Sequence, residues 1–166
     1  QGGKVKWAEK ARPGVFAQDH AADFASTTPL TEWIVQWVRE GGYEGGDVET
    51  LIRGTLGRLL FSGDDAKKPV NVISGGEQGR MLFGKLMLLR NNVLLMDEPT
   101  NHLDLTTREA LSIALNEFEG TVMLVSHDRA LLREVCDEFW MVSRGGVEPF
   151  DGDLDDFISA SLKQGV

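Results

Sequence analysis

An apolar run ends at two adjacent carboxylates in the stretch NVLLMDEPTNHLD, residues 92–104, and this transition decides the fold. The apolar residues 93–96 predict a strand buried on both faces, which is typical of a parallel sheet. Such a strand delivers the next residues to the carboxyl edge of the sheet, where open α/β folds bind ligands. Neighbouring side chains on an extended backbone point to opposite sides, so Asp97 can face a metal ion while Glu98 faces an attacking water. The alternative is a strand that simply ends in a solvated acidic turn.

An upstream motif, SGGEQ at residues 74–78, precedes an apolar-periodic helix predicted for residues 80–89. Ser74 and Glu77 have the spacing of a capping box, in which each side chain accepts a hydrogen bond from the backbone N–H of the other residue. The two glycines between them leave the amides open to an anion at the positive end of the helix dipole. The motif therefore predicts a helix start that can also bind phosphate.

A second apolar strand is predicted downstream at residues 121–126, and His127 follows it directly. A helix predicted for residues 106–118 fits between the two strands and makes them parallel. Both strands then end at the same edge of the sheet, so we expect His127 and Glu98 to lie on that same edge. A capping or surface histidine is the alternative for this position taken alone.

Four motifs in one order resemble those of ATP-binding-cassette (ABC) ATPases. They match the signature motif, the Walker B motif, the D-loop and the switch histidine, and in this chain they read SGGEQ (74–78), LLMDEP (94–99), HLD (102–104) and SHD (126–128). Gln18 resembles the Q-loop glutamine, because it stands at the end of a short predicted strand. The dipeptide Asn101-His102 and the ending FDGDLDDF, residues 150–157, resemble the soluble ABC-F branch more than the transporter branch.

The resemblance implies ATP and Mg²⁺ as ligands and ATP hydrolysis as the reaction. Asp97 and Gln18 would serve Mg²⁺, Glu98 would polarise the attacking water, and His127 would contact the γ-phosphate. Asp104 would link the two sites of a pair of cassettes. The signature residues would bind the ATP of the opposite cassette, and they are Ser74, Gly75, Gly76, Glu77 and Gln78. The expected partners are a second ABC cassette, from the same parent chain or a homodimer mate, and the ribosome, where ABC-F proteins act in translation.

The fold class implied by the resemblance is α/β, as a partial ABC-type nucleotide-binding domain with a mostly parallel sheet core. Residues 1–19 and 91–158 would form the core, residues 20–90 a helical subdomain that carries the signature motif, and residues 140–150 a terminal β-hairpin. Within these parts, the pattern predicts a short edge strand at residues 3–7 and a helix at residues 129–139.

Composition sets bounds on the function. The chain has 166 residues, 42% hydrophobic and 26% charged, as expected for one soluble globular domain, and no apolar run is long enough to span a bilayer. Cys136 is the only cysteine, so an internal disulfide is impossible and a cytoplasmic location is expected. The formal net charge of -9 argues against a large nucleic-acid contact, so we expect no direct DNA binding and ribosome contact through other parts of a parent protein.

One family feature is missing, because the sequence contains no Gly-x-x-x-x-Gly-Lys-Ser/Thr phosphate loop. The family places this loop ahead of the Q-loop, so we expect a chain that begins after it and is inactive alone. One alternative is an ATPase subunit of an ABC transporter or a DNA-repair ABC ATPase. Another, of a different class, is a non-catalytic interaction module that kept the ABC fold and lost nucleotide.

Overall fold

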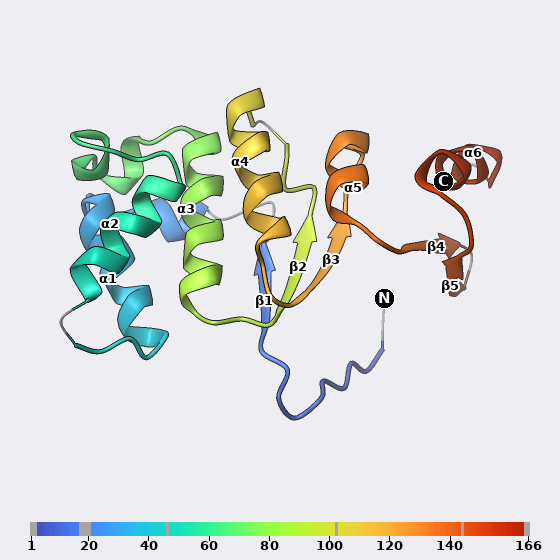
Figure 1. The fold of residues 1–166 in the computed structure, drawn as a ribbon, viewed down its shortest axis with the longest axis horizontal. Coiled ribbons are helices and arrows are strands. Elements are labelled where there is room, and N and C mark those ends of the chain that lie inside the picture. Colours follow the sequence, from blue (N-terminus) through green and yellow to red (C-terminus); the bar gives the residue numbers. More distant parts are fainter. Residues whose placement is uncertain (1–2, 17–20, 46, 102, 144, 165–166) are drawn as a thin grey trace.

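A parallel sheet of three strands, in the order β1-β2-β3, forms the centre of the molecule (Figure 1). The computed structural model describes residues 3–16, 21–45, 47–101, 103–143 and 145–164. The strands are β1 (Pro13–Phe16), β2 (Val93–Asp97) and β3 (Thr121–Val125), and helix α4 (Leu105–Asn116) connects β2 to β3. Because β2 and β3 are parallel, both end at the same edge of the sheet. The α/β class and the parallel pair expected from the sequence are confirmed.

The two faces of this sheet differ in burial. Leu94 and Met96 of β2 belong to the core and are 0% and 2% exposed. On the opposite face, Val15 and Met123 flank Leu95 in register, and they are 59% and 63% exposed. The prediction that β2 is buried on both faces is therefore wrong. The described residues cover one face of the sheet with helices and leave the other face open, so the apolar run alternates between the two environments.

The chain between β1 and β2 is mostly helical. It forms α1 (Leu30–Glu40), α2 (Val48–Arg58) and α3 (Gly75–Leu88), with short 3₁₀ helices η1 (Ala21–Phe24), η2 (Asp65–Lys67) and η3 (Val70–Val72). Helix α1 has an apolar stripe at helical spacing, and Trp33, Ile34 and Val38 on that stripe are buried. In Figure 1, α3 stands between α4 on one side and α1 and α2 on the other. Helix α3 therefore joins the helical part to the sheet.

The chain after β3 forms α5 (Arg129–Val135), β4 (Phe139–Ser143), β5 (Gly146–Phe150) and α6 (Leu154–Gln164). Strands β4 and β5 pair as the predicted antiparallel hairpin. Its turn uses Gly145 at φ 85°, a left-handed conformation that glycine adopts without strain. Helix α5 stops four residues before the predicted end at residue 139, because Cys136 leaves the helical region at φ -100° and ψ 130°.

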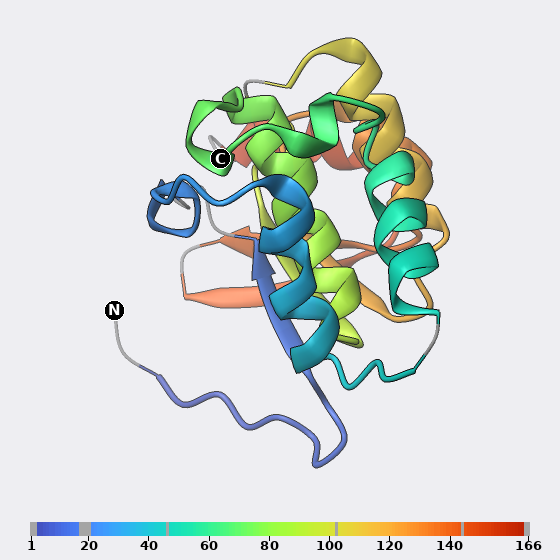
Figure 2. The same ribbon diagram turned by 90° about the vertical axis from the view of Figure 1, so that its left-hand side faces the viewer.

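The N-terminal residues do not form the predicted edge strand at 3–7. They run as an irregular segment away from the body of the molecule (Figure 2), and Val5 is 79% exposed. A strand exists only where a neighbour supplies its hydrogen bonds, and the described part of the chain offers none to this segment. The first strand is thus β1, which corresponds to the short strand predicted before Gln18.

Candidate active site

The two carboxylates of the central motif stand at the carboxyl end of β2, as predicted. Asp97 is the last residue of the strand and is exposed, whereas the Glu98 side chain is 13% exposed. The backbone at Glu98 has φ 48°, an unusual value for a residue with a side chain, and its N–H donates to the Val125 carbonyl at 2.8 Å. The chain therefore turns sharply at Glu98 while staying bonded to the end of β3. Strained backbone of this kind is concentrated at functional sites.

His127 lies against Glu98 at this edge. The His127 backbone N–H donates to Glu98 Oε2 at 3.3 Å, and His127 Nε2 lies 3.4 Å from Glu98 Oε1. The imidazole is otherwise open to solvent, since the His127 side chain is 99% exposed. The imidazole can therefore contact a further group from the solvent side while the Glu98 carboxylate stays against the protein. The prediction that the two residues share one edge of the sheet is confirmed, and the structure adds that they are in direct contact.

The loop after Glu98 leads directly into α4. The Asn101 N–H donates to the Glu98 carbonyl at 3.1 Å, and the Leu103 N–H donates to the Thr100 carbonyl at 3.1 Å. The neighbouring His102 of the D-loop motif lies outside the described residues. Two backbone hydrogen bonds thus stabilise the loop between β2 and α4, one at Glu98 and one at Thr100.

Asp104 caps α4 at the end of this loop. Its Oδ1 accepts a hydrogen bond from the Thr107 backbone N–H at 2.7 Å. This bond, followed by the Thr107 hydroxyl, lowers the pKa of Asp104 below its usual value, because both donors favour the charged carboxylate. The structure therefore gives Asp104 a local role at the helix start.

The signature motif forms the start of α3. The Ser74 N–H donates to Glu77 Oε2 at 2.7 Å, and the Glu77 N–H donates to Ser74 Oγ at 3.3 Å, which is the predicted capping box. Gln78 Nε2 donates to the Ile73 carbonyl at 3.4 Å. A Cβ built on Gly75 would meet no described atom within 4 Å. Packing among the described residues therefore gives no reason for glycine at position 75.

The start of α3 also lies close to the loop after β2. A Cβ built on Gly79 would stand 3.5 Å from Leu103 Cδ2 and 3.7 Å from the ring of Phe16, which is ordinary contact distance. Helix α3 therefore packs against both β1 and the D-loop.

The donor groups fit a magnesium ion that is held partly by a phosphate. No cluster of three or more His, Cys, Asp or Glu side chains suited to a metal occurs in the described ranges. Mg²⁺ in phosphate sites commonly uses one or two carboxylates, with water and phosphate oxygens as the other ligands. The exposed carboxylate of Asp97 meets that requirement, and Gln18, the second expected ligand, lies outside the described residues.

Near this edge the sequence reasoning missed Arg108 and gave Asp128 no role beyond its place in the SHD motif. Arg108 Nη1 lies 3.3 Å from Asp128 Oδ2, and Arg108 Nε donates to the Leu103 carbonyl at 3.2 Å. Asp128 follows His127 and precedes a helix, so its role as an N-cap was open to prediction. The partner of Arg108 was not, because 20 residues separate the two along the chain.

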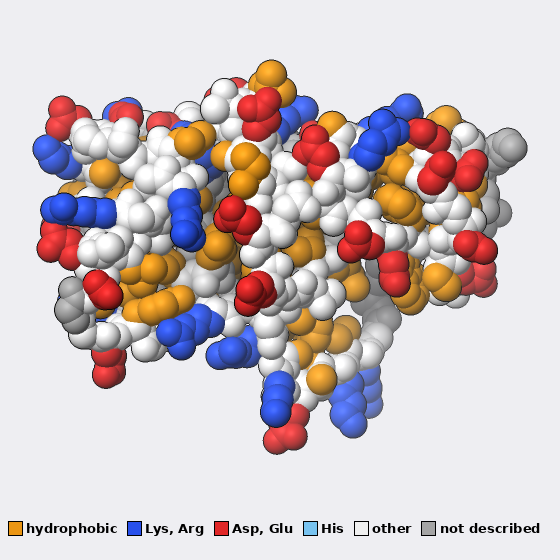
Figure 3. Space-filling view, in the orientation of Figure 1, with side chains coloured by type: hydrophobic (Ala, Val, Ile, Leu, Met, Phe, Trp, Pro, Cys, Tyr) orange, Lys and Arg blue, Asp and Glu red, His pale blue; other side chains and the backbone are white. Residues whose placement is uncertain are grey.

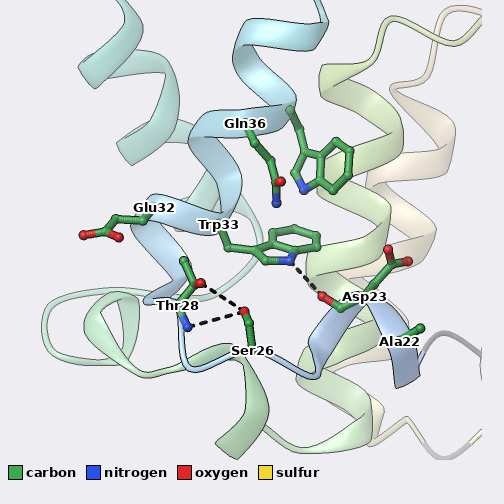
Figure 4. Close-up of a pocket in the computed structure, with 8 residues that line it drawn as sticks. Ala22, Asp23, Ser26, Thr28, Glu32, Trp33 and Gln36 are labelled. Atoms are coloured by element: carbon green, nitrogen blue, oxygen red, sulfur yellow. Dashed lines mark hydrogen bonds between the residues drawn. The ribbon is translucent and has the colours of Figure 1, made fainter.

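A separate pocket of about 320 Å³ is lined by residues of α1, of η1 and of the segment between them (Figure 4). Among its lining residues, Trp33 Nε1 donates to the Asp23 carbonyl at 3.0 Å, and Ser26 Oγ donates to Thr28 Oγ1 at 3.0 Å. Neither Glu98 nor His127 lines it.

Comparison with known proteins shows the family. The chain matches no family model. It is 47% identical over 156 residues to the probable ATP-binding protein YbiT of Escherichia coli O157:H7, covering 94% of this chain and 28% of that protein. It is 37% identical over 162 residues to the putative ATP-binding protein YdiF of Bacillus subtilis, covering 98% and 24%. It is 45% identical over 144 residues to ATP-binding cassette sub-family F member 3 of Pongo abelii, covering 87% and 20%.

Solved structures show the same fold. The RNase-L inhibitor superimposes with a TM-score of 0.71 at 22% identity, over 99% of this chain and 32% of that one. A dimeric post-hydrolysis state of the ATP-binding cassette MJ0796, bound to ADP and Pi, superimposes with a TM-score of 0.66 at 20% identity, over 86% and 65%. The chain spans about a quarter of the length of the curated relatives cited above. From this sequence similarity and this fold, the chain belongs to the ABC-F branch of the ATP-binding-cassette ATPases.

Proposed function

We propose that this chain supplies the Walker B, D-loop, switch and signature elements of an ATP-hydrolysing cassette in a longer ABC-F protein. The contact between Glu98 and His127 carries the proposal. It joins two residues that are 29 positions apart, at the carboxyl edge of a parallel sheet. Open α/β folds generally bind ligands at this edge, which supports the proposal. A solvated acidic turn would need neither the left-handed backbone at Glu98 nor this partner.

Glu98 is the proposed general base for the attacking water. Its side chain is mostly buried, and both of its oxygens face His127, so the carboxylate is oriented before substrate arrives. His127 is the proposed contact to the γ-phosphate, since its exposed ring can reach a bound ligand while its backbone stays on Glu98. Mg²⁺, when bound with ATP, would neutralise charge on the phosphates, and Asp97 is the residue of this chain that would hold it.

The signature residues are proposed to contact the ATP of a second cassette. The capping box fixes the start of α3, so the amides that follow Ser74 are presented in a defined orientation. The open space around Gly75 supports this assignment, because an approaching phosphate from another cassette would explain a glycine that internal packing does not require. The related MJ0796 cassette is described as a dimer bound to ADP and Pi.

A role in translation is the finer part of the proposal. ABC-F membership supports a cytoplasmic, ribosome-associated parent protein, with ribosomal RNA contacted mainly outside this chain. The net charge of -9 supports the view that other parts of the parent protein contact the RNA, because RNA binding relies on Lys and Arg. In Figure 3, Lys and Arg side chains are mixed with Asp and Glu over the visible face. No described helix is long and apolar enough to cross a membrane.

The test is ATP turnover by the longer protein with Glu98→Gln. We expect turnover to fall about 10²- to 10⁴-fold, which is the usual contribution of a positioned general base. ATP binding should be nearly unchanged, because the amide has almost the same shape, and ATP-bound cassettes should accumulate.

Glu117→Gln, an exposed change at the C-terminal end of α4, opposite the helix start that follows the D-loop, is the matched control and should leave turnover unchanged. Turnover of Glu98→Gln within twofold of the unaltered protein would show that Glu98 is not the base.

A further inference from the structure

A ring of contacts at the sheet edge is closed by a residue that belongs to none of the motifs, Arg108 on the first turns of α4. Arg108 Nε donates to the Leu103 carbonyl at 3.2 Å, and Arg108 Nη1 lies 3.3 Å from Asp128 Oδ2. Leu103 lies in the D-loop, and Asp128 directly follows His127. One guanidinium therefore bridges the two loops that carry the candidate catalytic groups.

Asp128 is fixed by hydrogen bonds of both its backbone N–H and its carboxylate. Its N–H donates to Ser126 Oγ at 3.0 Å, and its Oδ1 accepts from the Ala130 and Leu131 N–H groups at 3.1 Å each. Only Oδ2 turns to Arg108, and the Asp128 side chain is 14% exposed. Because Asp128 is bonded to residues on both sides of it in the chain, we expect a displacement of its carboxylate to shift the whole turn that contains His127.

The other end of the ring begins at Glu98. The Glu98 carbonyl accepts from Asn101, and the Leu103 N–H is bonded to Thr100, so the Leu103 carbonyl has a defined place relative to Glu98. The ring then runs from Glu98 through the D-loop to Arg108, across to Asp128, and back through His127 to the Glu98 carboxylate.

We propose that Arg108 is a positioning residue that holds the His127 turn against the D-loop and so sets the distance between His127 and Glu98. This inference rests on the proposed function and names a residue that controls its site. Arginine suits the task because its rigid fork satisfies a carbonyl and a carboxylate at the same time, which the single ammonium of lysine cannot do in the same geometry.

A purely structural role for Arg108 would be to staple α4 to α5. A second hydrogen bond also joins these two helices, from the buried Ser112 hydroxyl to the Glu134 carboxylate. The Arg108 side chain is 46% exposed, and exposed ion pairs add little to stability. Arg108 should therefore affect the geometry of the site much more than the stability of the fold.

The test compares Arg108→Ala with Arg133→Ala in the longer protein. Arg133 on α5 makes an exposed pair with Asp155 at 2.8 Å and does not touch the ring, so it is the matched control. We expect Arg108→Ala to lower kcat for ATP roughly 10-fold, since small displacements of catalytic groups slow reactions strongly, with KM for ATP within about twofold. Both variants should melt at the same temperature.

Arg108→Gln is the second variant, because it keeps a donor for the Leu103 carbonyl and loses the charge that faces Asp128. It should show the same loss of kcat even if the alanine variant folds poorly. Asp128→Asn, which retains the cap of α5, should lower kcat as well, and the double variant should be no slower than the worse single one. A kcat for Arg108→Gln within twofold of the Arg133→Ala control would overturn the inference.

The two proposals fail in different ways. Loss of the proposed function would appear as normal turnover in Glu98→Gln, or as no turnover in the unaltered longer protein. A failed inference about Arg108 would leave Glu98→Gln slow and both Arg108 variants fast. Additive effects in the Arg108–Asp128 cycle would likewise show that the two side chains do not act as a unit.

Discussion

At the scale of single residues, the site is built from groups that serve two purposes at once. Asp104 caps α4 and ends the D-loop motif, Ser74 caps α3 and begins the signature motif, and Asp128 caps α5 and follows the switch histidine. Each helix start leaves backbone N–H groups unpaired, and a short polar side chain satisfies them. The same residues that begin the helices thereby place the candidate functional loops.

Asp104 gives a prediction about pH. Its folded-state pKa is lowered by the Thr107 donors, so the charged form adds stability above the unfolded pKa of about 3.8. That stability is lost as the pH falls through the lower, folded pKa. Asp104→Ala should lower the melting temperature at pH 7, and the difference from the unaltered chain should shrink at pH 3 and below.

Asp104→Asn is the control for this prediction, because asparagine is also a good N-cap but does not titrate. It should keep most of the melting temperature at pH 7. Thermal unfolding followed by circular dichroism across pH 2–8 measures all three proteins. A constant difference between Asp104→Ala and the unaltered chain over that whole range would contradict the account.

At the scale of elements, helix α3 carries the signature motif at its start and packs against both the sheet and α1. It packs on the sheet through Gly79, and the end of α1 approaches it closely at Gly41. A Cβ built on Gly41 would stand 2.0 Å from the Leu88 carbonyl oxygen, a backbone atom that cannot swing aside. The glycine therefore permits the close packing of α1 against α3.

Gly41→Ala should destabilise the chain by about 1–3 kcal/mol, the usual cost of forcing extra volume into a packed contact. The matched control is Gly54→Ala in the middle of α2, where a Cβ would meet no described atom within 4 Å. That change should stabilise by about 0.5–1 kcal/mol through helix propensity. Urea unfolding of both variants measures the opposite signs, and a neutral Gly41→Ala would mean that α1 and α3 can separate freely.

At the scale of the whole molecule, two features limit what the chain can do alone. The sheet presents one open face, on which Val15, Met123 and Val125 are 58–63% exposed. The sequence also has no phosphate loop of the Walker A type, which in this family neutralises the β- and γ-phosphates. Phosphoryl transfer depends mostly on positioning and charge neutralisation, so Asp97 and Glu98 act on a substrate that other residues must hold.

The chain as given should therefore show no ATP hydrolysis and no tight ATP binding. A phosphate on the start of α3 gains only about 0.3–1 kcal/mol from the helix dipole at an exposed site, far from the energy of micromolar affinity. Calorimetric titration with MgATP is the measurement, and Glu98→Gln should give the same result in it. A dissociation constant below about 10 μM, or roughly 7 kcal/mol, would mean that residues of this chain hold nucleotide by themselves.

The local parts of the fold and site were predictable because their causes lie within a few residues. The apolar run before Asp97 determined β2, the spacing of Ser74 and Glu77 determined the capping box, and the helix between two apolar strands determined that His127 and Glu98 lie on the same edge of the sheet. In each case chain connectivity leaves few arrangements open.

Only the tertiary structure decided the features that depend on distant segments. Whether a face of the sheet is open depends on which elements pack over β2. A short run of apolar residues does not determine whether one face of its strand is covered or both. The missing strand at residues 3–7 depends on whether a neighbour stands beside it. The bridge from Arg108 to Leu103 and Asp128 depends on how α4 docks against the loop before α5, because the position of a long flexible side chain is settled by its surroundings in space and not by its sequence spacing.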